Sequence, residues 1–129
     1  MALPRDLRLR GDKAFDHLYR KGRRFHGTYL VLRSVVGEPS LLRAPLGQAP
    51  LQGCRCAVVV STKVSKRSVR RNRLRRLLHS WLSERCGQWP ADGHGLWLLL
   101  SLKPGCVEAS PEALLGECFE LFRKAGLSP

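Results

Sequence analysis

Lys63–Leu82 reads KVSKRSVRRNRLRRLLHSWL, and it joins a basic run directly to an apolar helical pattern. Its first fourteen residues, Lys63–Arg76, contain eight Lys or Arg and no acid. A solvated tail would not need apolar residues at helical spacing, which this stretch has at Leu74, Leu77, Leu78, Trp81 and Leu82. The pattern therefore predicts a helix that packs on a core and presents a fixed basic surface, with a polyanion as the expected partner.

The composition of the whole chain agrees with this interpretation. Its 129 residues predict a single domain over 1–129, and a hydrophobic fraction of 43% is enough for a small core. The net charge of +13 opposes compaction by self-repulsion, so a partner that offsets it is expected. Nucleic acid is the commonest such partner, and an anionic membrane surface is second.

A membrane role is not expected from the apolar segments. The longest apolar stretch, Leu96–Leu100, is too short to span a bilayer. A membrane-surface helix would need an exposed apolar face, whereas the apolar face of Lys63–Leu82 is needed for the core.

The cysteines and the first residues indicate a cytoplasmic protein. The five cysteines are odd in number and have no Cys-x-x-Cys spacing, so we expect reduced, mostly buried thiols and no metal site. Residues 1–10, MALPRDLRLR, lack the apolar segment of a signal peptide. They also lack a buried-face pattern and are expected to form a flexible basic arm.

Periodicity and helix-ending residues predict elements in the order α-β-β-α-β-α, a small α+β sandwich with helices packed on a short sheet. Helices are expected at Lys13–Lys21, at 68 to about 86, and from Pro111 to Gly126 with Ser110 as N-cap. Strands are expected at Thr28–Val36, Cys54–Thr62 and Leu96–Leu102. Residues 37–53, with three Pro and three Gly, predict a surface loop or insertion, and residues 87–94 predict a turn-rich link.

The basic run is the candidate nucleic-acid site. It combines charge with the unpaired N–H groups of a helix N-terminus, and its arginines suit bidentate phosphate contacts and base stacking. Asn72 can donate to a phosphate or accept from a base or ribose hydroxyl, or it can instead cap or hydrogen-bond a neighbouring backbone group. The candidate residues are Lys63, Lys66, Arg67, Arg70, Arg71, Asn72, Arg73, Arg75 and Arg76.

The segment STKVSKRSVRRNRLRRLL resembles the signature segment of the protein component of bacterial ribonuclease P, with Arg71-Asn72-Arg73 at its centre. The segments RLRGDKAFDHLYRKGRRF, TYLVLRSVV, VVVSTKV, LWLLLSLKPG and LFRKAG follow the family's order. The resemblance implies the order α-β-β-β-α-β-α and a left-handed β-α-β crossover. It also implies a short extra strand near Arg23–His26, which would complete a four-stranded sheet.

The resemblance implies a function as well. Such proteins bind a large catalytic RNA, help it to remove the 5′ leader from precursor tRNA, and broaden its substrate range. The basic run would bind the catalytic RNA, and a cleft between the first helix and the sheet would hold the single-stranded leader. Because the chemistry belongs to Mg²⁺ on the RNA, no catalytic residue, cofactor or metal is expected on this chain. The cleft residues implied by position are Phe15, Tyr19, Val31 and Arg33.

The implied cleft departs from the family at Arg33, where an aromatic residue is common. A guanidinium can stack on a base or contact a phosphate instead. Phe15 and Tyr19 suit stacking on unpaired bases without regard to sequence, and ordinary core packing is the alternative role for both.

Two other functions are compatible with a basic chain of this size. A ribosomal or other structural RNA-binding protein would share the charge but would not need accessible aromatics. A self-sufficient nuclease would need clustered catalytic groups. Its candidate histidines are dispersed, and no carboxylate pair accompanies them at a predicted strand end: His17, His26, His79 and His94.

Overall fold

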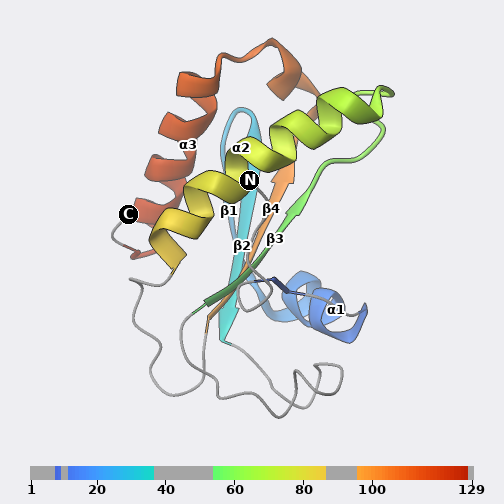
Figure 1. The fold of residues 1–129 in the computed structure, drawn as a ribbon. Coiled ribbons are helices and arrows are strands. Elements are labelled where there is room, and N and C mark those ends of the chain that lie inside the picture. The colour runs from blue at the N-terminus through green and yellow to red at the C-terminus, as the bar shows by residue number, and fades with distance from the viewer. Residues whose placement is uncertain (1–7, 10–11, 37–53, 87–95, 128–129) are drawn as a thin grey trace.

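The computed structural model describes residues 8–9, 12–36, 54–86 and 96–127 (Figure 1). Within those ranges the order α-β-β-β-α-β-α is confirmed, including the short strand at Arg23–His26. The elements are α1 (Asp12–Lys21), β1 (Arg23–His26), β2 (Leu30–Val36), β3 (Cys54–Val59), α2 (Ser68–Cys86), β4 (Leu96–Leu102), the 3₁₀ helix η4 (Pro104–Glu108) and α3 (Pro111–Lys124).

The four described strands form one mixed sheet in the order β1-β2-β4-β3. β2 pairs antiparallel with both β1 and β4, whereas β3 and β4 are parallel neighbours. A parallel pair needs a crossover connection, and α2 lies within the one that joins β3 to β4. The left-handed sense of this crossover stays an implication of the family resemblance.

β4 is one of the two inner strands and contributes to a core on each face of the sheet. Its residues alternate, so that Leu98, Leu100 and Leu102 pack under α2 and α3. Trp97 and Leu99 pack on the opposite face against α1 (Figure 1). A strand buried on both faces has to be apolar throughout, which explains the sequence LWLLLSL.

The predicted apolar face of α2 is confirmed. Leu78, Trp81 and Leu82 are buried, whereas Leu74 and Leu77 are only partly covered. The Trp81 ring meets Phe122 of α3 edge-on, with centroids 5.0 Å apart. α2 is therefore held by the sheet beneath it and by α3 beside it.

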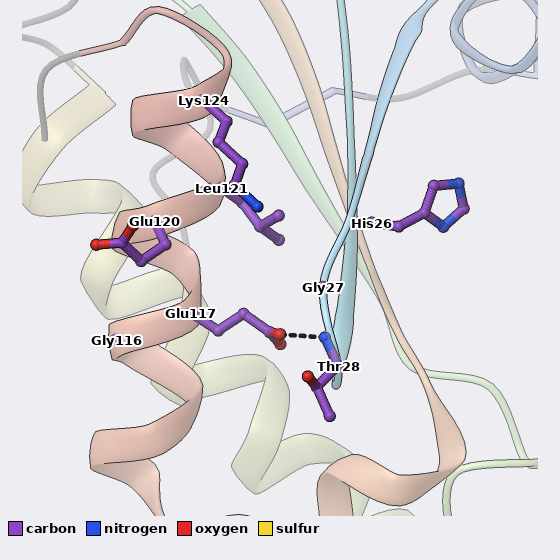
Figure 2. A pocket seen from close by; sticks show the side chains of 8 residues that line it. All are labelled: His26, Gly27, Thr28, Gly116, Glu117, Glu120, Leu121 and Lys124. Atoms are coloured by element: carbon purple, nitrogen blue, oxygen red, sulfur yellow. Dashed lines mark hydrogen bonds between the residues drawn. The ribbon is translucent and has the colours of Figure 1, made fainter.

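The turn between β1 and β2 is held by hydrogen bonds from two sides. As a result, β2 is shorter than the sequence predicted. The backbone N–H of Thr28 donates to the Glu117 carboxylate of α3 (Figure 2). The N–H of Tyr29 donates to the same carboxylate at 2.8 Å. Lys103 donates from Nζ to the Gly27 carbonyl oxygen at 2.7 Å. β2 consequently begins at Leu30 rather than Thr28, because the two N–H groups before it are already bonded to α3.

Two further features differ from the sequence prediction. β3 ends at Val59 rather than Thr62, and the chain then turns, with the Val64 N–H donating to the Ser61 carbonyl at 3.0 Å. After β4, Pro104–Glu108 is the 3₁₀ helix η4, where only a break was expected. The insertion at 37–53 and the link at 87–94 lie outside the described residues.

Within the arm predicted for residues 1–10, the structure describes Arg8 and Leu9, and Leu9 packs against the sheet. Its side chain is buried, and its backbone N–H donates to the Cys56 carbonyl at 2.8 Å. β3 is an edge strand, and an edge offers unpaired backbone groups to any neighbouring segment. Arg8 pairs with β3 there as an isolated parallel bridge, while the remaining positions of the arm lie outside the described residues.

The structure describes three buried cysteine thiols, at Cys56, Cys106 and Cys118. Burial raises the pKa of the Cys118 thiol to about 12 and also raises that of Cys56. These thiols are therefore protonated at physiological pH and act as small core residues.

We expect Glu117→Gln to lower the free energy of unfolding by about 1–3 kcal/mol, because an amide has one acceptor oxygen for two backbone donors. Denaturant unfolding of the purified chain measures this. The matched control is Glu120→Gln, which alters an exposed carboxylate 3.9 Å from Arg123 and should change stability little. Equal stability of the two variants would show that the turn does not depend on the carboxylate.

Candidate nucleic-acid interface

The nine candidate residues of the basic run lie on the loop before α2 and on its first half, and we call them the basic surface. Arg71 and Arg75 are partly buried, and the other seven are exposed. The helix contains no acid in its first turn. Most of its charge therefore stays in solvent while the buried apolar residues of α2 fix the helix to the core.

Arg71 and Asn72 make contacts within the protein. Arg71 donates from Nη1 to the Ser65 carbonyl oxygen at 2.8 Å, and thereby ties the preceding loop to the helix. Asn72 accepts from Arg75 at 2.8 Å through Oδ1, so its side chain orients a neighbouring cation. This partner is a side chain, whereas the alternative considered from the sequence was a bond to a neighbouring backbone group.

A hollow of about 550 Å³ opens at the N-terminus of α2. The positive end of the helix dipole and its unpaired N–H groups point toward this end of the helix, which makes it suited to an anion. Sequence reasoning missed the contribution of Val69, whose side chain is 70% exposed. The hollow is lined by Lys66, Arg67, Ser68, Val69, Arg70 and Arg73.

His79 adds no positive charge to this side of α2. Partial burial, followed by the nearby charges of Arg75 and Arg8, lowers its pKa to about 4. The imidazole is consequently neutral at physiological pH, and the charge of the basic surface comes from Lys and Arg alone.

The four implied leader residues lie where α1 meets the sheet, and we call them the leader surface. The Arg33 Cζ atom lies 4.6 Å from the centre of the Tyr19 ring, a cation–π contact. Tyr19 is 51% exposed, whereas Phe15 is partly buried against the Trp97 cluster and Val31 is buried. The structure brings Tyr19 and Arg33 into contact and gives Phe15 a share in the core.

Arg33 is only weakly hydrogen-bonded within the described residues. Its Nη1 reaches Ser101 Oγ only at 3.4 Å, and its buried Nε has no hydrogen-bond partner among the described residues. The guanidinium is thus held at the sheet surface by its contact with a ring more than by hydrogen bonds.

The β1 register adds basic residues beside the leader surface that sequence reasoning missed. Arg24 pairs with Arg33 and His26 pairs with Val31, so all four belong to the same face of the sheet. Figure 2 shows His26 pointing away from α3, in agreement with that register. The missing signal was the antiparallel pairing, because a four-residue strand has too short a pattern to reveal its register.

The described residues contain no group of three His, Cys, Asp or Glu placed to hold a metal ion. None of the helices in the described ranges is long and apolar enough to cross a membrane. What the two surfaces offer chemically is fixed cations, backbone donors and aromatic faces, which are groups that bind phosphates and bases.

Comparisons with known proteins agree with this chemistry. A family model described as Ribonuclease P matches residues 3–126. The ribonuclease P protein component of Parasynechococcus marenigrum (strain WH8102) is 53% identical over 127 residues, covering 98% of each chain. That of Prochlorococcus marinus (strain MIT 9313) is 51% identical over 129 residues, again covering 98% of each.

Solved structures support the same fold at much lower identity. The Staphylococcus aureus RNase P protein superposes with a TM-score of 0.76 at 13% identity, covering 95% of this chain and 98% of that one. The Thermotoga maritima RNase P protein gives a TM-score of 0.64 at 20% identity, covering 90% and 96%.

Proposed function

The chain belongs to the ribonuclease P protein family, and on that premise we propose that its two surfaces bind two different RNAs. As the accessory subunit of a tRNA-processing endoribonuclease, the protein binds the RNA subunit and assists removal of the 5′ leader. In our proposal the basic surface binds the catalytic RNA, and the leader surface binds the single-stranded 5′ leader of precursor tRNA.

The arrangement of the two surfaces carries this proposal. The basic surface belongs to α2, which packs on one face of the sheet, and the leader surface belongs to the face that α1 covers (Figure 1). β4 lies between them and contributes core residues to both. A chain with two separated RNA-binding surfaces can hold a catalyst and a substrate together, which a single basic patch cannot do.

The basic surface suits a large structured RNA. Its exposed cations neutralise phosphates and release counterions, and its positions are fixed by the packed helix that carries them. The bond from Arg71 to Ser65 makes Arg71 a positioning residue for the loop, in addition to a source of charge. The exposed cations Arg70 and Arg73 at the hollow are the strongest candidates for direct phosphate contact.

The leader surface suits an unpaired strand. An exposed tyrosine can stack on any base, and the guanidinium of Arg33 beside it adds a positive charge that can attract a phosphate. Relative to a cleft with an aromatic at this position, we expect leader binding here to depend more on salt concentration.

The chemistry of cleavage belongs to the RNA subunit in this proposal. Mg²⁺ held by the RNA would supply the catalysis, and the chain would contribute binding energy with no cofactor of its own. The setting is the cytoplasm, where precursor tRNA is processed.

The central experiment is reconstitution. The purified chain alone should not process precursor tRNA, whereas adding it to its cognate RNA subunit should support cleavage at low magnesium concentration. Release of the 5′ leader is measured in both reactions. Robust cleavage by the chain without RNA would overturn the assignment of catalysis to the RNA.

If the basic surface binds the RNA subunit, the affinity should depend on salt concentration. Arg73→Ala should weaken binding to the RNA subunit and reduce the slope of log affinity against log salt by roughly 0.7–0.9, because one phosphate contact is lost. Filter binding over a salt series measures the slope. Arg123→Ala is the matched control, since it removes an equal charge from the exposed C-terminal turn of α3. The same slope in both variants would remove Arg73 from the interface.

If the leader surface binds the 5′ leader, its contribution to affinity should depend on the length of the leader. Tyr19→Ala should weaken binding of precursor tRNA with a long leader about tenfold or more, through the loss of one stacked base, and should leave a one-nucleotide leader unaffected. Tyr19 is a cleaner probe than Phe15, which also packs in the core. Phe119→Ala is the control, because Phe119 is an exposed aromatic on α3. An equal loss for both leader lengths would point to misfolding instead.

A further inference from the structure

An apolar groove of about 290 Å³ lies between α2 and the segment that connects β4 to α3. Two sides of α2 meet there, because Arg70 and Arg73 of the basic surface also line it. Its apolar walls come from the first half of α2, from η4, and from the start of α3: Leu74, Leu77, Val107, Ala109, Pro111 and Leu114.

The groove exists because the apolar face of α2 is only partly covered toward the helix N-terminus. Leu78 and Leu82 are buried in the core between α2 and the sheet, whereas Leu74 and Leu77 are only partly buried. Val107 and Ala109 on the opposite wall are also partly buried. This apolar surface is in contact with water in the free protein. Covering it with a ligand removes it from water, which favours binding.

The size and charge of the groove restrict its occupant. Its volume is at the lower end of pockets that hold small molecules, which run from about 300 Å³ upward, so it suits one flat ring system better than a partner helix. Its lining contains two arginines and no acid, which favours an anionic ligand. A second copy of this chain, with a net charge of +13, is disfavoured for the same reason.

The groove is also continuous with the hollow at the N-terminus of α2, since Arg70 and Arg73 line both. A nucleotide can therefore place its base against the apolar walls while its phosphate contacts the same two arginines. Sequence-specific recognition of RNA mostly uses unpaired bases, which stack on aromatic side chains or guanidinium planes. The groove offers two guanidinium groups beside aliphatic walls.

We propose that this groove takes one unpaired base of the RNA subunit, with the adjoining phosphate held by Arg70 and Arg73. The inference rests on the proposed binding of that RNA by the basic surface. It adds Leu74, Leu77 and Val107 to the interface as contacts to a base, where charge alone predicted only contacts to phosphates.

Filling the groove tests the proposal. Ala109 has extended backbone angles, φ −82° and ψ 144°, which any residue can adopt, so Ala109→Trp should block the groove without straining the chain. Ala113→Trp is the matched control, because Ala113 is exposed on the first turn of α3 and does not line the groove. Affinity for the RNA subunit, its salt slope, and the reactivity of unpaired bases toward base-specific reagents are compared in the two variants.

We expect Ala109→Trp to weaken RNA binding about tenfold or more relative to Ala113→Trp, with the salt slope unchanged because the phosphate contacts remain. One unpaired base that the wild-type protein protects should become reactive. Where Ala109→Trp melts well below the control, Val107→Ser replaces it, since it removes an apolar wall without adding bulk, and the same loss and exposure are expected.

Three results would overturn an assignment, and they are distinguishable. Equal affinity and equal base reactivity in the groove variants and the control would remove the base from the groove while leaving the basic surface intact. Failure of the wild-type chain to bind the RNA subunit would overturn the proposed function itself. A dimer of the isolated chain in sedimentation, abolished by Ala109→Trp, would assign the groove to self-association instead.

Discussion

The packing of α2 on the sheet is the interaction on which the rest of the molecule depends. Eight cations fall between Lys63 and Arg76, and like charges this close repel one another unless the backbone that carries them is held. Leu78, Trp81 and Leu82 hold it by burial, each contributing about 1.5–3 kcal/mol as large side chains removed from water. The edge-on contact between Trp81 and Phe122 adds α3 to the same support.

Strand β4 extends this support to both faces of the sheet. Successive side chains of β4 point alternately to the face covered by α2 and α3 and to the face covered by α1. One strand therefore supports both proposed RNA surfaces from below. The catalytic RNA and the leader would then approach different faces and need not compete for one patch of charge. The division also explains why the core consists of two clusters separated by the sheet.

Contacts within the basic surface show that charge and position are separate properties. Arg71 is partly buried and bonded to the loop, and Asn72 orients Arg75, whereas Arg70 and Arg73 face two hollows. Residues that look equivalent in the sequence therefore divide into those that position the surface and those free to meet RNA. The apolar groove adds a third kind of contact, which a count of charges cannot reveal.

Local patterns predicted the elements with strong internal signals. α2, β4 and the capped start of α3 begin at the predicted residues, because an apolar period, a continuous apolar run and a Ser-Pro cap are properties of adjacent residues. The start of β2 and the attachment of Leu9 were missed because each depends on a partner far along the chain. Glu117, for example, lies 89 residues from the Thr28 N–H that it binds.

The basic helix, its apolar face, the α+β class and, through the Arg71-Asn72-Arg73 segment, the family resemblance could all be predicted from the sequence. These features reside in periodicity, charge and adjacent residues. The contact of Arg33 with Tyr19, the place of Arg24 beside them, and the open groove where Leu74 and Leu77 meet Val107 appear only in the folded chain. Such contacts depend on strand register and on how helices pack, which are set by the whole core and not by any one segment.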